Sequence, residues 1–228
     1  MKRSIGVGLV LALFAESIAW SQELTPRIEL PKVYQSSLTD PKETERWEFM
    51  DDKWSLDTIE GISVLRLHDS ASSLAPKFRS PTHLAILRDL QVNEFQLDVK
   101  VRSTREDYNH RDVCFYFGYQ SPTEYYYAHL AKKTDDRANQ IFIVNNADRI
   151  KISTKTTDGT SWDDKWHQVR VTRDEENEIR VYFDDMTTPI MTANDGSLKG
   201  GRIGVGSFDD TADFSEITLR GNRVDQGK

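Results

Sequence analysis

Hydrophobic and polar residues alternate along much of the chain with the two-residue period of a β-strand. The clearest case is residues 94–102, where Phe95, Leu97, Val99 and Val101 are separated by charged or amide side chains. Successive side chains of a strand point to opposite faces of its sheet, so one face of this strand is predicted to be buried and the other wetted. No long run shows the 3.6-residue period of a helix. The pattern therefore predicts an all-β protein.

Short runs rich in β-branched and aromatic residues recur from Trp47 onward and predict further strands. Residues 113–119 and 125–131 flank a polar turn at residues 120–123 and predict a hairpin. The remaining predicted strands are residues 140–145, 149–153, 167–173, 179–184, 202–207 and 214–219. Many short strands joined by turns indicate a sandwich or a barrel.

The N-terminus has a different character from the rest of the chain. Two basic residues, Lys2 and Arg3, precede an apolar run over residues 5–14, and small residues follow as far as Ser21. This layout is typical of a secretory signal peptide, and the run is shorter than the ~20 residues that span a bilayer. We expect residues 1–21 to be the signal peptide, cleaved after Ala19 or Ser21. The mature protein is then secreted or periplasmic, with no membrane span.

The mature chain is expected to contain one domain. Residues 22–46 carry three prolines among mixed charges, which predicts an extended N-terminal leader or an edge segment. Residues 47–221 hold the predicted strands, and residues 222–228 are expected to form a flexible tail.

Charge and cysteine content exclude several classes of protein. The chain has 37 acidic and 30 basic residues, a formal net charge of -7. Nucleic-acid-binding proteins usually concentrate lysine and arginine on one face, so no nucleic-acid partner is expected. The single cysteine, Cys114, excludes an intramolecular disulfide and a zinc site built from several thiolates. It is interpreted as a small core residue, and stability must come from packing.

The C-terminal half resembles the successive strands of concanavalin A-like jelly rolls. The segments that carry the resemblance are WHQVRV at 166–171, VYFD at 181–184, GRIGVGSF at 201–208 and FSEITL at 214–219, together with 77–81 and 95–102 upstream. This superfamily includes laminin G modules, legume-type lectins, laminarinase-type glycosidases and secreted bacterial 3-keto-disaccharide hydrolases, of which the last type is nearest. The resemblance implies a two-sheet antiparallel jelly-roll sandwich. It also implies a shallow groove on the concave sheet, where glycans usually bind in this superfamily.

A glycan site in that groove needs aromatic faces for sugar rings and polar groups for hydroxyls. Tyr125, Tyr127 and His129 point to one face by their two-residue spacing, and a polar loop at residues 132–140 follows them. The predicted ligand-binding residues are His110, Tyr125, Tyr127, His129, Asp135, Asp136 and Asn139. The expected function is therefore an exported carbohydrate-recognition protein that binds a polysaccharide or an oligosaccharide. The simpler interpretation is ordinary packing, with at least one of the tyrosines purely structural.

Two alternatives stay open. A glycoside hydrolase of the 3-keto-disaccharide hydrolase type would take its acid and base from Glu124, His129 and Asp135, because a histidine beside a carboxylate can move protons near neutral pH. The three alternating acids of laminarinase-type enzymes are incomplete here, since Gln96 occupies the middle position. The second alternative is a laminin G-like protein-interaction module, with its protein partners unknown.

Acidic residues between the last two predicted strands suggest one metal site. Asp209, Asp210 and Asp213 lie close together in sequence, and carboxylate oxygens are ligands that calcium prefers. The expected functions require no cofactor, so a calcium ion here would be structural.

Overall fold

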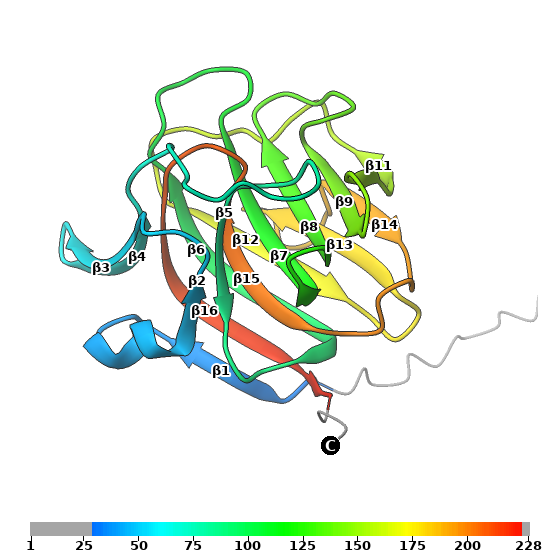
Figure 1. Ribbon diagram of the computed structural model, residues 1–228, viewed down its shortest axis with the longest axis horizontal. Coiled ribbons are helices and arrows are strands. Elements are labelled where there is room, and N and C mark those ends of the chain that lie inside the picture. The colour runs from blue at the N-terminus through cyan, green and yellow to red at the C-terminus, as the bar shows by residue number, and fades with distance from the viewer. Residues whose placement is uncertain (1–28, 225–228) are drawn as a thin grey trace, which may run out of the picture.

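Two antiparallel β-sheets face each other across an apolar interior (Figure 1). The structure, a computed structural model, describes residues 29–224. The predicted signal peptide and the last four residues of the predicted tail lie outside the described residues. Among residues 29–224, no helix is long and apolar enough to cross a membrane.

Sheet A has the strand order β11-β14-β13-β12-β6-β16-β4-β3, with β1 paired to β16. Its strands are β1 (Lys32–Ser36), β3 (Trp54–Ile59), β4 (Ile62–Leu67), β6 (Val92–Ser103), β11 (Ser153–Thr156), β12 (His167–Arg173), β13 (Glu178–Phe183), β14 (Met191–Asn194) and β16 (Ala212–Arg223).

Sheet B has the order β10-β9-β8-β7-β15-β5-β2. Its strands are β2 (Trp47–Phe49), β5 (His83–Leu87), β7 (Asp112–Ser121), β8 (Glu124–Ala131), β9 (Gln140–Asn145), β10 (Ile150–Lys151) and β15 (Arg202–Ser207). The two antiparallel sheets confirm the predicted all-β sandwich.

Most predicted strands are confirmed, and some with their predicted bounds. Residues 140–145, 167–173 and 202–207 are β9, β12 and β15. The single strand predicted at 149–153 is wrong, because β10 pairs with β9 in sheet B while β11 pairs with β14 in sheet A. The chain therefore changes sheets within a run that looked continuous in sequence.

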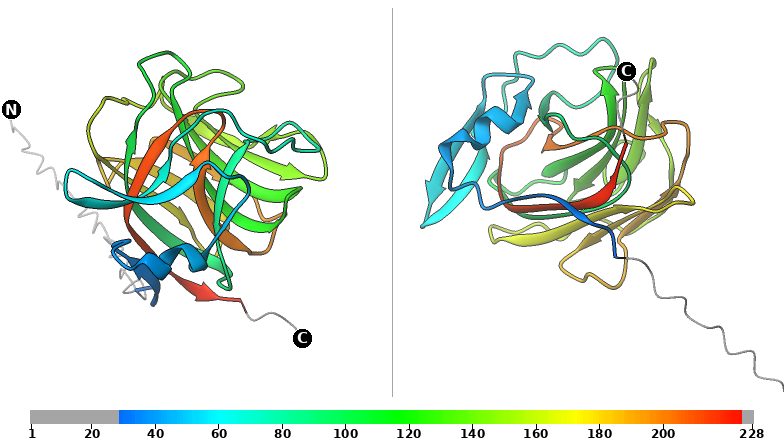
Figure 2. Two further views of the ribbon diagram at one scale, coloured as in Figure 1. Left: turned by 60° about the vertical axis from the view of Figure 1, so that its left-hand side comes forward. Right: turned by 90° about the horizontal axis from the view of Figure 1, so that it is seen from below.

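The predicted leader contributes an edge strand to sheet A. β1 pairs with β16, and Figure 2 shows β1 in blue alongside β16 in red. The short 3-10 helix η1 (Pro41–Arg46) follows, with Asp40 accepting a hydrogen bond from the amide of Lys42. Residues 32–36 of the segment thus form an edge strand.

The interior between the sheets is formed by the alternating apolar positions of both. Phe115 and Tyr126 from sheet B are fully buried there, as are Val99 and Phe214 from sheet A. β6 has the predicted alternation, with buried residues at every second position from Phe95. This face of each strand supplies the main hydrophobic stabilisation of the fold.

A bulge interrupts the alternation in β7. Gly118 has φ +58, a conformation that favours glycine, and the β7–β8 register shifts between Phe117 and Ser121. As a result Tyr116 and Tyr119, three residues apart, belong to the same buried cluster, while Phe117 faces the interior.

Candidate functional site

The face of sheet B that points away from sheet A, called here the far face, is as buried as the interior. Its apolar cluster consists of Leu84, Ile86, Cys114, Tyr116, Tyr119, Tyr125, Tyr127, Phe142 and Val144. Met50, Leu74 and Phe208 pack against this cluster. Sheet B is therefore covered on both sides.

The segment between β4 and β5 forms much of this cover. Within it, Ser72 donates hydrogen bonds to the carboxylate of Asp51 and to the carbonyl oxygen of Thr82. Arg79 donates its backbone N–H to Asp148, beyond β9. These bonds attach residues 68–82 to both ends of sheet B.

A buried histidine anchors this covering segment. His83 Nδ1 lies 2.7 Å from Asp51 Oδ2, and its Nε2 lies 3.1 Å from the carbonyl oxygen of Ser70. Burial alone lowers the pKa of His83, but these two partners outweigh burial and raise it. Burial likewise raises the pKa of Asp51, and hydrogen bonds from His83 and Ser72 reverse the effect and lower it. Both shifts favour the charged form of each group, and both side chains are fully buried.

Tyr125 and Tyr127 share the far face, as their spacing predicts, but their rings are not open to solvent. Tyr125 is 1% exposed and Tyr127 is fully buried. The ring of Phe142 stacks on Tyr127 at 5.1 Å, and Arg149 donates to the Tyr127 hydroxyl at 2.9 Å. Burial raises the pKa of Tyr127 well above its ordinary value. The expectation that these rings line an open groove is wrong, because strand periodicity assigns a face without showing what covers it.

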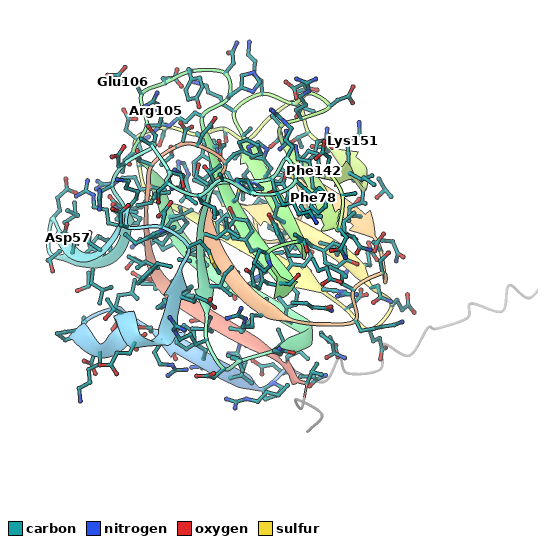
Figure 3. The ribbon with its side chains drawn as sticks, viewed as in Figure 1. Asp57, Phe78, Arg105, Glu106, Phe142 and Lys151 are labelled. Atoms are coloured by element: carbon teal, nitrogen blue, oxygen red, sulfur yellow. The ribbon has the colours of Figure 1, made fainter. Side chains whose placement is uncertain are left out.

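The opening on this side of the molecule lies at the β9–β10 edge. A pocket of about 250 Å³ is lined by Arg79, Asp136, Arg137, Phe142, Asp148, Arg149 and Lys151. Figure 3 labels Phe142 and Lys151 at this edge. The Arg149 guanidinium lies over the rings of both Phe142, at 4.7 Å, and Phe208, at 4.5 Å. The pocket thus has one aromatic lining residue, Phe142, among charged side chains.

Three guanidinium groups of this pocket have no ionic partner. Within residues 29–224 no carboxylate lies within 4.0 Å of the side chains of Arg79, Arg137 or Arg149, whereas Lys151 is paired with Asp136 at 2.6 Å. Arg137 belongs to the polar loop singled out at residues 132–140, but none of the three arginines was among the predicted ligand-binding residues. Arg79 and Arg149 stand in other segments, so nothing local in the sequence groups the three.

The predicted polar loop divides into exposed and buried members. His110 Nε2 lies 3.9 Å from Asp135 Oδ2, with both side chains about half exposed. Asp136 lies on the pocket rim. Asn139 is fully buried, and its side chain donates to Thr134 and accepts from Thr160. Asn139 therefore holds the loop in shape.

The three candidate acid–base residues do not meet. Glu124 begins β8 and accepts a hydrogen bond from Ser121, while His129 lies five residues further along the strand. At ~3.3 Å per residue this separation is about 16 Å. Asp135 lies beside His110 and pairs with neither Glu124 nor His129 among the described residues.

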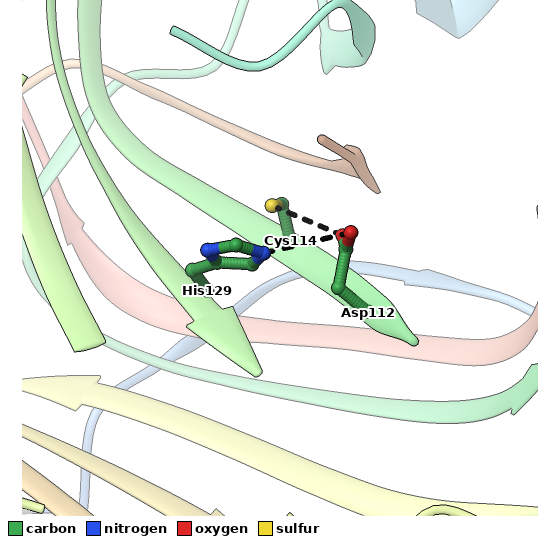
Figure 4. A group of neighbouring side chains, drawn as sticks. All are labelled: Asp112, Cys114 and His129. Atoms are coloured by element: carbon green, nitrogen blue, oxygen red, sulfur yellow. Dashed lines mark hydrogen bonds and ion pairs between the residues drawn. The ribbon is translucent and has the colours of Figure 1, made fainter. Parts of the chain in front are cut away.

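His129 lies in a different group of side chains. Asp112, Cys114 and His129 are the three residues within 29–224 whose ligand atoms gather closely enough to hold a metal ion (Figure 4). All three are buried. Burial also raises the pKa of the Cys114 thiol well above its usual range.

The aspartates predicted to bind calcium are separated in the fold. Asp213 is fully buried between Arg102, at 2.9 Å, and Arg66, at 3.3 Å. Asp210 accepts from the Tyr108 hydroxyl and from the backbone N–H of Asp112. Burial and the nearby Asp112 carboxylate raise the pKa of Asp210 to about 6. Asp209 is exposed, and calcium at these residues stays a prediction.

Comparison with known proteins identifies the fold. No family model matches the chain, and no curated protein sequence matches it. A carbohydrate-binding module from Bacillus subtilis superposes with a TM-score of 0.54 at 18% identity, over 77% of this chain and 96% of that chain. A protein of unknown function with a galectin-like fold from Bacillus subtilis gives 0.56 at 11% identity, over 87% and 99%.

A third solved structure is domain 4 of an extracellular arabinanase from Geobacillus stearothermophilus, in complex with arabinotriose. It gives a TM-score of 0.52 at 8% identity, over 86% of this chain and 95% of that chain. At these identities the likeness concerns the fold. It confirms the two-sheet jelly-roll sandwich, and the resemblance to concanavalin A-like proteins, including the 3-keto-disaccharide hydrolases, stays a prediction.

Proposed function

We propose that this protein is a carbohydrate-binding protein, and that its glycan binds in the pocket at the β9–β10 edge of sheet B. The observation that carries the proposal is the pocket itself, in which six charged side chains surround one aromatic residue, Phe142. Its volume of about 250 Å³ is suited to one or two sugar rings and not to a long chain held along its length. The site thus shifts from the predicted tyrosines to the adjoining strand and turn.

The solved neighbours support a glycan as the ligand. They include a carbohydrate-binding module, and an arabinanase domain in complex with arabinotriose. A sandwich of this kind hosts many functions, so the pocket chemistry must supply the specificity.

The charge of the pocket favours an acidic sugar. Four cationic side chains and two carboxylates line it, although the whole chain has a net charge of -7. A planar guanidinium matches a carboxylate or sulfate group through two parallel hydrogen bonds. Arg79, Arg137 and Arg149 have no ionic partner within residues 29–224, so they retain this capacity. The preferred ligand is therefore a glycan that carries uronic acid or sulfate groups.

The test is binding to paired acidic and neutral oligosaccharides by calorimetry, with release of reducing sugar followed in the same samples. We expect oligogalacturonate or a sulfated galactan fragment to bind, with affinity falling as salt increases. Arg79→Ala and Arg137→Ala should each weaken binding about tenfold or more, because each removes a charge-assisted hydrogen bond. Arg46→Ala is the matched control, since Arg46 also lies over an aromatic ring, Tyr34, but outside the pocket.

Three results would contradict this function. Equal binding of neutral and acidic sugars, unchanged in the arginine variants, would show that this pocket is not the glycan-binding site. Steady release of reducing sugar that is abolished by Glu124→Gln or Asp135→Asn would favour the hydrolase instead. Capture of a protein partner without any glycan binding would favour the laminin G-like alternative.

Export completes the proposal. The N-terminal segment has the layout of a signal peptide, and an extracellular or periplasmic location would give the protein access to polysaccharides. N-terminal sequencing of protein secreted by its host should begin at residue 20 or 22. A chain that retains residue 1 would contradict export by this route.

A further inference from the structure

We propose that Asp112, Cys114 and His129 form a binding site for one zinc-like divalent cation. Strand register brings the three together. Cys114 lies directly opposite His129 in the β7–β8 pair, and Asp112 precedes Cys114 by two residues on the same face. Figure 4 shows the three side chains pointing toward one another from these two strands.

The Asp112 carboxylate lies close to both of the other side chains. Asp112 Oδ2 lies 3.5 Å from His129 Nε2, and Asp112 Oδ1 lies 3.8 Å from Cys114 Sγ. All three ligand atoms lie within 4.8 Å of one another. Zinc bonds of ~2.0–2.3 Å place the ligand atoms of a tetrahedral site roughly 3.3–3.8 Å apart. The histidine–carboxylate distance is, by contrast, longer than an ordinary N–H···O hydrogen bond.

The histidine is held with its lone pair toward the site. Its Nδ1 lies 3.1 Å from the carbonyl oxygen of Arg137, which can only accept, so Nδ1 carries the proton. Nε2 is buried and has no hydrogen-bond partner among the described residues. The whole side chain is 6% exposed. A buried ring nitrogen without a partner is costly unless a further group completes its coordination.

Hydrogen bonds also fix the orientation of the Asp112 carboxylate. Asp112 Oδ1 accepts from the Ser207 hydroxyl and from the backbone N–H of Phe208, both at 2.9 Å. Its Oδ2 is therefore directed toward His129. Outer partners of this kind typically orient metal-binding histidines and carboxylates.

The set of donor atoms selects the class of ion. Thiolate sulfur, imidazole nitrogen and carboxylate oxygen together suit zinc or cobalt, whereas calcium and magnesium prefer oxygen alone. When the ion binds, the Cys114 thiol releases its proton to water. The thiolate, the carboxylate and the dication then sum to zero charge, which a buried site requires.

The ion would link parts of the fold that are distant in sequence. His129 is held through Arg137, in the loop that lines the glycan pocket, and Asp112 is held through the turn after β15. The expected role of the ion is to stabilise this end of sheet B. Binding of the ion does not depend on the proposed glycan.

The test uses the full-length purified protein, freed of metal with a chelator and titrated with Co²⁺. We expect a thiolate-to-cobalt charge-transfer band that saturates at one equivalent and is displaced by Zn²⁺. Zinc should also raise the melting temperature up to the same stoichiometry. Cys114→Ser should abolish the band, and His129→Gln should weaken zinc binding at least about tenfold. His110→Gln, an exposed histidine on a nearby loop, should change neither.

Circular dichroism first confirms that each variant is folded. A wild-type protein with no charge-transfer band and no zinc-dependent rise in melting temperature would overturn the proposal. Equal cobalt binding by wild type and Cys114→Ser would also overturn it, since the ion would then sit elsewhere. In either case Asp112, Cys114 and His129 do not share an ion.

Discussion

The two faces of sheet B are both buried, but they are built from different chemistry. The face toward sheet A is formed by apolar side chains such as Phe115, Ala128 and Ile141, and it packs against the other sheet. The far face mixes aromatic rings with buried ionisable groups, including His83, Asp112 and His129. A sheet-on-sheet interface needs only shape and apolar area. A face covered by loops must also provide hydrogen-bond partners for the polar groups of those loops. Buried polar and ionisable side chains are therefore found on the far face.

The largest effect should come from the face toward sheet A. Phe115→Ala removes a fully buried ring that meets Phe214 edge to face at 6.3 Å. We expect the free energy of unfolding to fall by ~3–5 kcal/mol because a cavity is left. Urea denaturation measures the change, with the exposed Thr58→Ala as control, expected within ~0.5 kcal/mol of wild type. A loss below about 1 kcal/mol would mean that this face is not the main source of stability.

Breaking the buried ion pair on the far face should cost less. Asp51→Asn leaves the His83 imidazole without its carboxylate but keeps an oxygen acceptor. We expect a loss of ~1–3 kcal/mol, together with faster cleavage of residues 68–82 in limited proteolysis, because this pair anchors that segment. Asp52→Asn, at an exposed neighbouring position, is the control. Unchanged cleavage of the segment would contradict the anchoring role.

The same pair should make stability depend on pH. The raised pKa of His83 gives a contribution that is complete below the ordinary histidine pKa of ~6.5 and is lost as pH rises through the folded value. The lowered pKa of Asp51 gives a contribution present above its ordinary pKa of 3.8, and lost as pH falls through its lowered value. The pair therefore stabilises most between these limits.

Thermal melts of wild type and His83→Gln across this range measure the effect. The difference between the two proteins should be greatest near pH 5–6 and should shrink on alkalinisation. Asp69, within the segment, and Asp112 also act on His83 and stay present in both proteins. A constant difference from pH 5 to pH 9 would show that His83 does not change its charge over this range.

The smallest effect concerns one hydroxyl group. Tyr127→Phe keeps the buried ring but removes the acceptor of the Arg149 hydrogen bond, with an expected cost of ~0.5–1.5 kcal/mol. Because Arg149 lines the pocket, affinity for the acidic oligosaccharide should fall as well. Tyr119→Phe, on the same face but outside the pocket, is the control. If Tyr127→Phe changed neither stability nor affinity, the Tyr127 hydroxyl would have no role in positioning Arg149 for binding.

The sequence was a good guide to the strands and a poor guide to the site. The alternation in residues 94–102 predicted β6 and its buried side, and the spacing of Tyr125, Tyr127 and His129 predicted their common face. Exposure of those rings was predicted wrongly, since residues from distant parts of the chain, among them Met50, Leu74 and Phe208, pack against them. The pocket arginines were missed because they come from separate segments.

The all-β class, and the side of its sheet toward which each strand residue points, were determined by the sequence itself. A two-residue period is a local property, since successive side chains of an extended backbone must point in opposite directions. Only the tertiary structure decided that both faces of sheet B are covered, and that Cys114 lies opposite His129. Cover and register depend on contacts between distant segments, and short-range patterns carry little information about those contacts.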